Sequence, residues 1–320
     1  MSQRCLFCYQ PLDENEIDFH SRCSKKIFGV SIPPLLPFAE THMEELAEQI
    51  IQSHTAVTGV QPKLSLHLAS AEKPNLVKRF TIVGVRGGFI LKPPTPHYSQ
   101  LPEVEDLTMH LANIAKIKVV PHSLIRLASN NLAYITQRID RVKNDKLHME
   151  DMCQLTNRLT EDKYRGSHEQ VAKAILKYSA HPQLDIINFY ELVLFSFLTG
   201  NADMHLKNFS LIHQPDVGPV FSPAYDLVAT ALVNPADDED LALTLNSKKK
   251  KINRNDFIAA FTNIGLDSKQ QENIFKKMQK AKPLWIEFIE ISFLNAEMKT
   301  NYKNLLNDRF SRLLVEKPRD

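Results

Sequence analysis

Short segments in the first half of the chain have the polar and apolar pattern of β-strands. Residues 63–68 alternate between the two classes, while 88–92 and 132–139 read as further strands, the first of which stops at a proline. Successive strand side chains point to opposite faces of a sheet, so alternation predicts a half-buried strand. Apolar positions at helical spacing predict helices over 42–53 and 103–114. We therefore expect a strand-rich region with a few helices.

Helical spacing dominates after residue 150. The segment 186–198 is apolar on nearly all sides, which predicts a buried helix, and 169–178 is a further helix. Surface helices are expected over 254–264, 270–279 and 284–294. The whole pattern predicts an α+β fold with a small N-terminal extension (1–30), a strand-rich N-terminal lobe (31–140) and a helical C-terminal lobe (141–320).

Composition narrows the class of protein only slightly. With 320 residues, 43% hydrophobic and 24% charged, the chain can bury a full core, and its net charge of +2 gives no strong field for nucleic acid. No apolar run is long enough to cross a bilayer, and the N-terminus lacks the apolar region of a signal peptide. We expect a cytoplasmic protein that does not contact the membrane.

The N-terminal extension contains a candidate metal site. Cys5 and Cys8 form a C-x-x-C pair, and His20 and Cys23 follow as an H-x-x-C pair. Three thiolates and one imidazole can fill the tetrahedral coordination of a structural Zn²⁺ ion, and a module this short benefits from a metal. The alternative is that these are reduced, buried cysteines beside an incidental histidine.

The segment 201–210 carries the strongest chemical signal. Asp203 and Asn208 are five residues apart, and Asp226 follows further along the chain. Phosphoryl transfer needs one carboxylate to accept the proton of the attacking hydroxyl, and an amide and a second carboxylate to hold Mg²⁺. The alternative is a helix-to-loop junction rich in capping residues.

Two further features fit a nucleotide site. The loop 55–63 precedes a strand and contains a single glycine, but it matches no standard phosphate-binding motif. Lys92 ends a strand and could neutralise phosphates. One carboxylate of the Glu103/Glu105 pair could anchor this lysine, whereas capping of the helix that begins there is the alternative role.

Together these segments resemble the HipA family of bacterial toxin kinases. The match covers most of residues 50–265 and leaves the N-terminal extension outside. Its elements, in chain order, are 58–63, 90–93, 101–105, 137–141, 148–153, 162–164, 200–210 and 222–227.

This resemblance implies a two-lobed protein-kinase-like fold and phosphorylation of serine or threonine with ATP and Mg²⁺. By position, Asp203 becomes the catalytic base, and Asn208 and Asp226 become the Mg²⁺ ligands. His205 and Lys207 lie in the catalytic loop, where Lys207 either touches the γ-phosphate or shapes the loop. Metaphosphate-like transfer needs mainly positioning and charge neutralisation, so these roles agree with the residues themselves.

The resemblance also implies how ATP is held. Lys92 contacts the α- and β-phosphates, and the backbone from Gln137 to Ile139 forms the hinge that reads adenine. The loop over the phosphates contains Thr58, Gly59, Val60, Gln61 and Lys63.

One position departs from the family pattern. Family members commonly carry a phosphorylated serine where this chain has Ala56, which has no hydroxyl group. Either Thr58 or Thr55 takes over as the site of autophosphorylation, or the residue has been altered to prevent modification.

The resemblance further implies a biological context. The chain lacks the small domain that precedes the kinase core in the long family members, so it is most similar to the stand-alone HipT-type kinase of three-component HipBST systems. That places it as the toxin of a type II toxin–antitoxin system, with a HipS-like small antitoxin and a HipB-like helix-turn-helix protein as partners. DNA contact would run through the partner, and the substrate would be an aminoacyl-tRNA synthetase. The alternatives are a small-molecule kinase and an inactive scaffold in a HipB-type repressor complex.

Overall fold

The structure is a computed structural model that describes residues 3–40, 63–69, 77–83, 87–142 and 145–314. The expected helix over 42–53 lies outside these residues. The chain divides into two compact units, each described here by itself. Unit 1 comprises Met1–Asp106, Val120–Arg141 and Ile291–Phe293, and unit 2 comprises Leu107–Val119, Val142–Glu290 and Leu294–Asp320.

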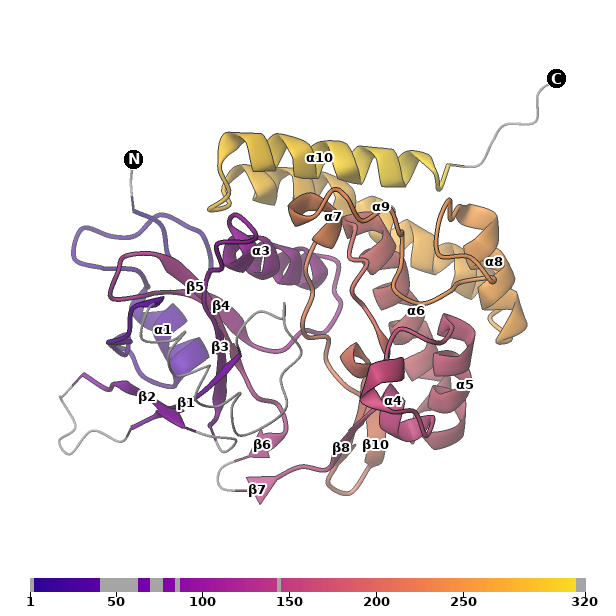
Figure 1. The fold of residues 1–320 in the computed structure, drawn as a ribbon, viewed down its shortest axis with the longest axis horizontal. Coiled ribbons are helices and arrows are strands. Elements are labelled where there is room, and N and C mark those ends of the chain that lie inside the picture. The colour runs from indigo at the N-terminus through magenta and orange to yellow at the C-terminus, as the bar shows by residue number, and fades with distance from the viewer. Residues whose placement is uncertain (1–2, 41–62, 70–76, 84–86, 143–144, 315–320) are drawn as a thin grey trace. The chain divides into compact units, whose positions relative to one another are not determined.

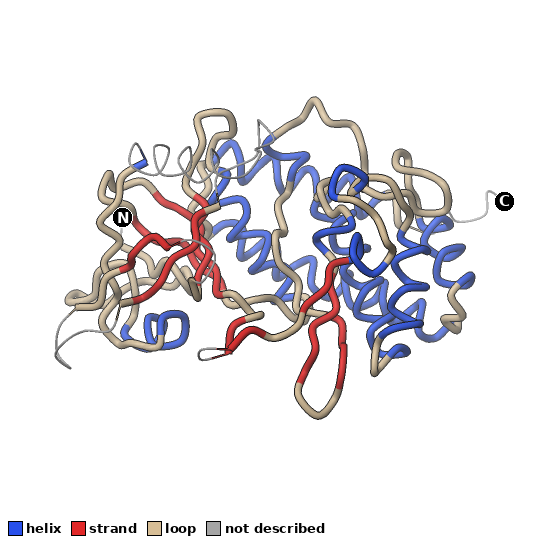
Figure 2. Tube along the Cα trace, turned by 60° about the horizontal axis from the view of Figure 1, so that its bottom comes forward, coloured by secondary structure: helices blue, strands red, loops and turns tan. Residues whose placement is uncertain are grey.

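Unit 1 contains a five-stranded antiparallel sheet (Figure 2). The three strands expected from the sequence are present, each within two residues of its predicted bounds, whereas the pattern missed two others. The buried side chains of Leu64 and Leu66 alternate with exposed His67, as the period of two predicts. The spatial order is β2 (Phe80–Val83), β1 (Leu64–Leu68), β3 (Phe89–Lys92), β5 (Leu132–Gln137) and β4 (His122–Arg126).

Helix α1 (Ser21–Phe28) packs on this sheet (Figure 1). The ring of Phe28 lies 5.7 Å from that of Phe80 and 6.1 Å from that of Phe89, so the helix joins an aromatic cluster on β2 and β3. Aromatic pairs at these separations contribute attraction beyond the burial of their area. The N-terminal extension is therefore part of the core of unit 1.

Unit 2 is mainly helical, as expected. The predicted buried helix is α6 (Pro182–Thr199), whose residues from Phe189 onward are all buried. Two predicted helices, 270–279 and 284–294, are instead one continuous helix, α9 (Ser268–Glu290), which contains Pro283. Helix α10 (Ala296–Ser311) was not predicted and lies beside α9 in Figure 1. None of the helices in the described ranges has the length and apolarity that a membrane span requires.

The remaining elements include the predicted helices over 103–114, 169–178 and 254–264, which are present as α3 (Leu101–Ile114), α5 (His168–Tyr178) and α8 (Arg254–Asn263). In unit 2 the strands β8 (Met149–Asp151), β9 (Ser210–Gln214) and β10 (Gly218–Phe221) form a small antiparallel sheet. A separate two-stranded sheet consists of β6 (Arg141–Val142) and β7 (Asp145–Lys146). The other helices are α4 (Met152–Leu155), η1 (Thr160–Asp162), η2 (Leu206–Asn208) and α7 (Thr230–Val233).

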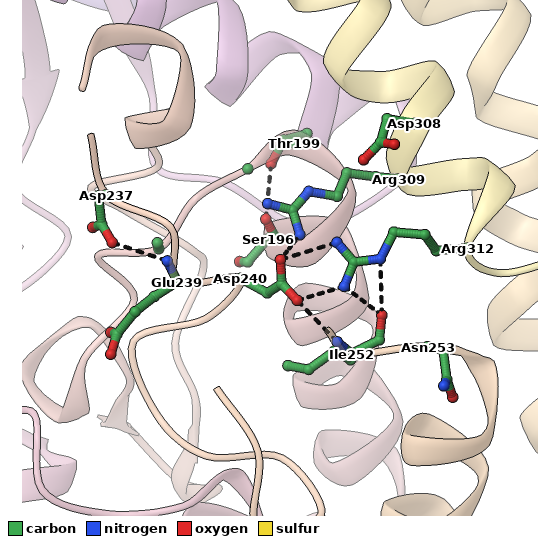
Figure 3. A network of polar contacts seen from close by, with 12 residues as sticks. Ser196, Thr199, Asp237, Glu239, Asp240, Ile252, Asn253, Asp308, Arg309 and Arg312 are labelled. Carbon is green, nitrogen blue, oxygen red and sulfur yellow. Dashed lines mark hydrogen bonds and ion pairs between the residues drawn. The ribbon is translucent and has the colours of Figure 1, made fainter. Parts of the chain in front are cut away.

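A buried carboxylate, Asp240, is the centre of a polar network in unit 2 (Figure 3). It accepts hydrogen bonds from Arg312 Nη1 (3.0 Å) and from the Ile252 amide (2.9 Å), and it also pairs with Arg309. Both arginines belong to α10 or its C-terminal cap. The network therefore fastens this helix to the loop that contains Asp240.

A buried histidine in α5 makes the stability of unit 2 depend on pH. His168 is fully buried beside Phe189 and Phe209, and neither of its ring nitrogens has a hydrogen-bond partner within the described ranges. Burial disfavours the imidazolium and lowers the pKa of His168 to about 3. Between that value and the ordinary 6.5 the unfolded chain binds a proton that the folded chain does not, so stability falls as pH decreases.

We therefore expect His168→Phe to flatten the acid side of the stability profile. The wild-type free energy of unfolding should fall by about 1.4 kcal/mol more per pH unit than that of the variant below pH ~6.5. Urea unfolding followed by fluorescence of Trp285, the single tryptophan and a buried residue of unit 2, measures the difference between pH 7.5 and 4.5. Equal slopes for the two proteins would contradict the assignment.

Candidate active site

The candidate catalytic loop starts at the C-terminal end of the buried helix α6. Gly200 caps this helix with a left-handed φ of 67°, a conformation that glycine adopts without steric cost. A Cβ atom at this position would lie 2.8 Å from Leu305 Cδ2 and 2.9 Å from Ala231 Cβ. Only glycine therefore fits where the helix turns into the loop.

Short hydrogen bonds fix the first residues of the loop. The hydroxyl of Thr230 accepts from the Ala202 amide (2.8 Å) and donates to the Gly200 carbonyl (3.2 Å). The Asn201 side-chain oxygen accepts from the amide of Asp203 (3.2 Å). These contacts hold the backbone of Asp203 while its side chain remains exposed to solvent.

Asp203, Asn208 and Asp226 lie in one neighbourhood of unit 2. The side-chain NH₂ group of Asn208 donates to the main-chain carbonyl oxygen of Asp203 at 3.0 Å. The Tyr164 hydroxyl donates to Asp203 Oδ1 at 2.6 Å. Burial raises the pKa of Tyr164, and the hydrogen bond to Asp203 and the charges of Asp203 and Asp226 raise it further. Tyr164 therefore keeps its proton at neutral pH and donates it to the hydrogen bond with Asp203.

Asp226 has a left-handed backbone with φ of 60°, a conformation that aspartate and asparagine tolerate better than most residues. Its side chain is half-buried. The strained region of backbone space is sparsely populated and often marks functional sites. This backbone conformation sets the direction of the Cα–Cβ bond of Asp226.

The two other predicted loop residues have structural contacts. Lys207 Nζ lies 2.9 Å from Asp151 Oδ2, and the Lys207 carbonyl accepts from the hydroxyl of Tyr225 (3.0 Å). His205 is buried, and burial lowers its pKa. Both groups of Lys207 thus contact residues around the loop, which fits the loop-shaping role of the two that the sequence left open.

In unit 1, Lys92 forms a buried ion pair. Its Nζ lies 2.5 Å from Glu105 Oε1, and both side chains are at most 5% exposed. Burial raises the pKa of the neighbouring Glu103 to about 7. The sequence left open whether Glu103 or Glu105 pairs with Lys92, and the structure shows that Glu105 is the partner.

The predicted hinge begins with Gln137, the last residue of β5. The amide of Gln137 donates to the Pro121 carbonyl (2.9 Å), and its side chain donates to the Ile27 carbonyl (2.5 Å). The next amide, of Arg138, donates to Gly88 (2.9 Å), whereas Ile139 lies beyond the strand. The main-chain N–H groups of residues 137 and 138 are therefore already hydrogen-bonded within unit 1.

The phosphate loop is described only at its end. Lys63 is exposed and immediately precedes β1. The other residues that the sequence assigned to this loop lie outside the described residues: Thr55, Ala56, Thr58, Gly59, Val60 and Gln61.

The four predicted zinc ligands come together in unit 1. One side-chain ligand atom from each of Cys5, Cys8, His20 and Cys23 lies within 4.8 Å of the others. All four cysteines of the chain are free thiols, so no disulfide joins them.

Four residues that hold the catalytic loop had no assigned role from the sequence. Asp151, Tyr164 and Tyr225 lie within segments that match the family, but no spacing rule pairs them with Lys207 or Asp203. The signal for Thr230 was weaker still, because it lies outside those segments and polar residues near short helices are common. These supporting residues are Asp151, Tyr164, Tyr225 and Thr230.

Comparison with known sequences gives consistent matches. A family model described as the HipA-like C-terminal domain matches residues 55–285. A Haemophilus influenzae protein named "Putative kinase" is 26% identical over 351 residues, which cover 95% of this chain and 98% of that protein. "Putative kinase Y4dM" of Sinorhizobium fredii is 31% identical over 182 residues, which cover 53% of this chain and 43% of that protein.

Comparison with solved structures identifies a kinase-like fold. A chain of the Shewanella oneidensis toxin–antitoxin complex of HipA, HipB and operator DNA matches with a TM-score of 0.67 and 22% identity, covering 83% of this chain and 70% of that one. The Helicobacter pylori proinflammatory kinase CtkA matches with a TM-score of 0.55 and 15% identity, covering 78% of this chain and 93% of that one.

Proposed function

Because the chain belongs to the HipA-like C-terminal domain family, we propose that it is a serine/threonine protein kinase that uses ATP and Mg²⁺. The observation that carries the proposal is the loop after α6, where Asp203 is exposed, the Asn208 side chain is hydrogen-bonded to the Asp203 carbonyl, and Tyr225, which precedes Asp226, is hydrogen-bonded to the Lys207 carbonyl. The kinase-like fold and the names of the relatives support it.

Asp203 accepts the proton of the attacking hydroxyl group, and its exposure leaves room for a substrate. Asn208 and Asp226 hold Mg²⁺, because amide and carboxylate oxygens are the hard ligands that this ion prefers. When bound, the ion neutralises charge on the transferring phosphoryl group. Lys92 contacts the α- and β-phosphates, and the ion pair with Glu105 holds its ammonium group in position.

The remaining assignments concern the nucleotide and the loop. Ile139 and the carbonyl side of Gln137 read adenine, since the amides at 137 and 138 are used within unit 1. Lys207 and His205 position the catalytic loop. The phosphates are covered by Thr58, Gly59, Val60, Gln61 and Lys63, and Thr58 or Thr55 is autophosphorylated in place of Ala56.

We also place the chain in a toxin–antitoxin system. The Shewanella neighbour was solved with HipB and its operator DNA, which supports a HipB-like partner that carries the DNA contact. A HipS-like antitoxin, a HipT-type subclass, an aminoacyl-tRNA synthetase as substrate and a cytoplasmic site of action complete the proposal. Labelling of a metabolite instead of a protein would favour the small-molecule kinase, and ATP binding without turnover would favour the inactive scaffold.

The test compares two aspartates that share a backbone conformation. Asp226 and Asp216 both have left-handed φ, of 60° and 63°, which asparagine also tolerates. We expect Asp226→Asn to lower Mg²⁺-dependent transfer from labelled ATP by about 10²-fold or more, the size typical of losing one charge-stabilising group. Asp216→Asn, in the exposed turn after β9, should retain activity.

Mass spectrometry of the chain incubated with ATP and Mg²⁺ provides the readout. Phosphate on Thr58 or Thr55 should appear in the wild type and in Asp216→Asn, and be nearly absent from Asp226→Asn. Equal phosphorylation of the two variants would remove Asp226 as a metal ligand. A wild type that transfers no phosphate to itself, to protein in a lysate or to small molecules would refute the kinase.

A further inference from the structure

We propose that Cys5, Cys8, His20 and Cys23 bind one structural Zn²⁺ ion, and that this ion fastens the N-terminal knuckle (residues 3–29) to the sheet of unit 1. His20 Nδ1 lies 3.4 Å from Cys8 Sγ and 3.7 Å from Cys23 Sγ. A tetrahedral ion with Zn–S of about 2.3 Å and Zn–N of about 2.0–2.1 Å separates its ligand atoms by about 3.5–3.8 Å. The two separations from His20 thus match those of a bound ion, and all four ligand atoms lie within 4.8 Å of one another.

The histidine is oriented as zinc-binding histidines are. Its Nε2 lies 2.9 Å from the Pro11 carbonyl oxygen, to which it can donate a hydrogen bond. That bond places the proton on Nε2 and leaves the lone pair of Nδ1 directed at the two sulfur atoms. An incidental histidine would need neither this tautomer nor this direction.

The burial of the cluster distinguishes a structural from a catalytic site. Cys5 is completely buried, His20 and Cys23 are 8% and 6% exposed, and Cys8 is half-buried. Four protein ligands fill a tetrahedral ion and leave no position for substrate. The chain turns sharply between the ligand pairs, with left-handed φ at Tyr9 (64°) and Asp18 (59°). A metal offsets the cost of these conformations in so short a segment.

The knuckle covers the free edge of the sheet. Strand β4 is an edge strand, and the amide of Leu124 and the hydroxyl of Ser123 both donate to the carbonyl of Leu6, between the first two cysteines. On the same strand, Arg126 makes a two-pronged ion pair with Asp18. Exposed strand edges need such a cover, and here the cover contains the metal ligands.

The knuckle also contacts the end of β5. Helix α1 carries Cys23 and ends near Ile27, whose carbonyl accepts the side-chain hydrogen bond of Gln137. Loss of the metal would release this contact beside the residues assigned to adenine. The resulting loss of ATP affinity rests on the proposed function, whereas the metal site itself does not.

Metal content tests the site directly. We expect the full chain, purified under reducing conditions, to contain about one zinc ion by inductively coupled plasma mass spectrometry. Cys8→Ser should lose most of this metal, and the matched control Cys153→Ser, which alters the buried cysteine outside the cluster, should keep it. His20→Gln should lose metal, and the exposed His97→Gln should not.

A spectroscopic measurement on the wild-type chain tests the site without relying on variants, which can fail to fold. Wild-type chain reconstituted with Co²⁺ should show thiolate-to-cobalt charge-transfer absorption and tetrahedral d–d bands. A chain without zinc that also binds neither Zn²⁺ nor Co²⁺ would overturn the site. Equal loss of zinc from Cys8→Ser and Cys153→Ser would do the same.

Hydrogen–deuterium exchange tests the fastening. After chelation, peptides that contain Leu124 and Gln137 should exchange faster, while α6 of unit 2 should not change. Faster exchange confined to residues 3–29 would overturn the role of the knuckle in the sheet and leave the metal site in place. Unchanged metal binding with no detectable kinase activity would count against the proposed function alone.

Discussion

Asp203→Asn is expected to lower phosphoryl transfer by about 10²–10⁴-fold, the range for loss of a general base, while ATP binding is retained. Asparagine keeps the shape of the side chain and retains an oxygen that can accept the hydrogen bond from the Tyr164 hydroxyl. It cannot take the proton of an attacking hydroxyl group. The backbone contacts of Asn201 and Asn208 to residue 203 do not involve its carboxylate, so the loop should persist.

Steady-state transfer from labelled ATP and equilibrium binding of a nucleotide separate the two effects. Tyr164→Phe serves as a control, because it removes the only hydrogen bond that the described residues make to the Asp203 carboxylate. If Asp203→Asn acted only by disturbing that contact, Tyr164→Phe would cause an equal loss. An Asp203→Asn protein with near wild-type activity would remove the catalytic base from the proposal.

The sequence predicted α6 from its uniform apolarity and α3, α5 and α8 from their helical spacing, but it divided α9 and missed α10. Helix α6 was recognisable because almost every residue is apolar. In α9, the gap between the two predicted helices contains Pro283, yet the buried face continues through Ala281 and Trp285, and packing maintains one helix. Helix α10 was missed because few of its residues are apolar, and one of its buried residues is Arg309.

The candidate site shows a similar limit. Local spacing singled out Asp203, Asn208 and Asp226, and the structure places them in one neighbourhood. Spacing could not decide between Glu103 and Glu105 as the partner of Lys92, because the choice depends on how the start of α3 is rotated in the core. Glu105 is the carboxylate that is completely buried.

Contacts between distant segments were beyond any local pattern. Tyr164 meets Asp203 across 39 positions of the chain, and Asp151 meets Lys207 across 56. Each is a single polar pair with no periodicity to indicate it. The predicted zinc ligands are the contrasting case, because C-x-x-C and H-x-x-C spacing place four residues in a segment of fewer than thirty, and their ligand atoms lie within 4.8 Å of one another.

Replacing Asp240 with Asn is expected to destabilise unit 2 by about 3–5 kcal/mol, the cost of removing one partner of a buried ion pair. The substitution leaves Arg309 and Arg312 without their counter-charge (Figure 3). It also turns an acceptor into an NH₂ group that faces a guanidinium or the Ile252 amide. Neither arginine can lose its proton to relieve the burial.

The pH dependence gives a second signature. Burial alone would raise the pKa of Asp240, but the hydrogen bonds from Arg312 and the Ile252 amide and the charge of Arg309 outweigh it, and the net pKa is lowered. A lowered pKa means that the carboxylate contributes its full stability above its unfolded value of about 3.9 and loses it as pH falls through the folded value. Asp240→Asn should remove that acid-induced component.

Urea unfolding followed by the fluorescence of Trp285 measures both effects in unit 2. Asp238→Asn is the matched control, since Asp238 pairs with Lys250 at the surface, where solvent screens the charges. We expect a large decrease in the urea midpoint for Asp240→Asn and little change for Asp238→Asn. Equal midpoints for the two variants would mean that the arginines find other partners and that α10 is held by its apolar contacts instead.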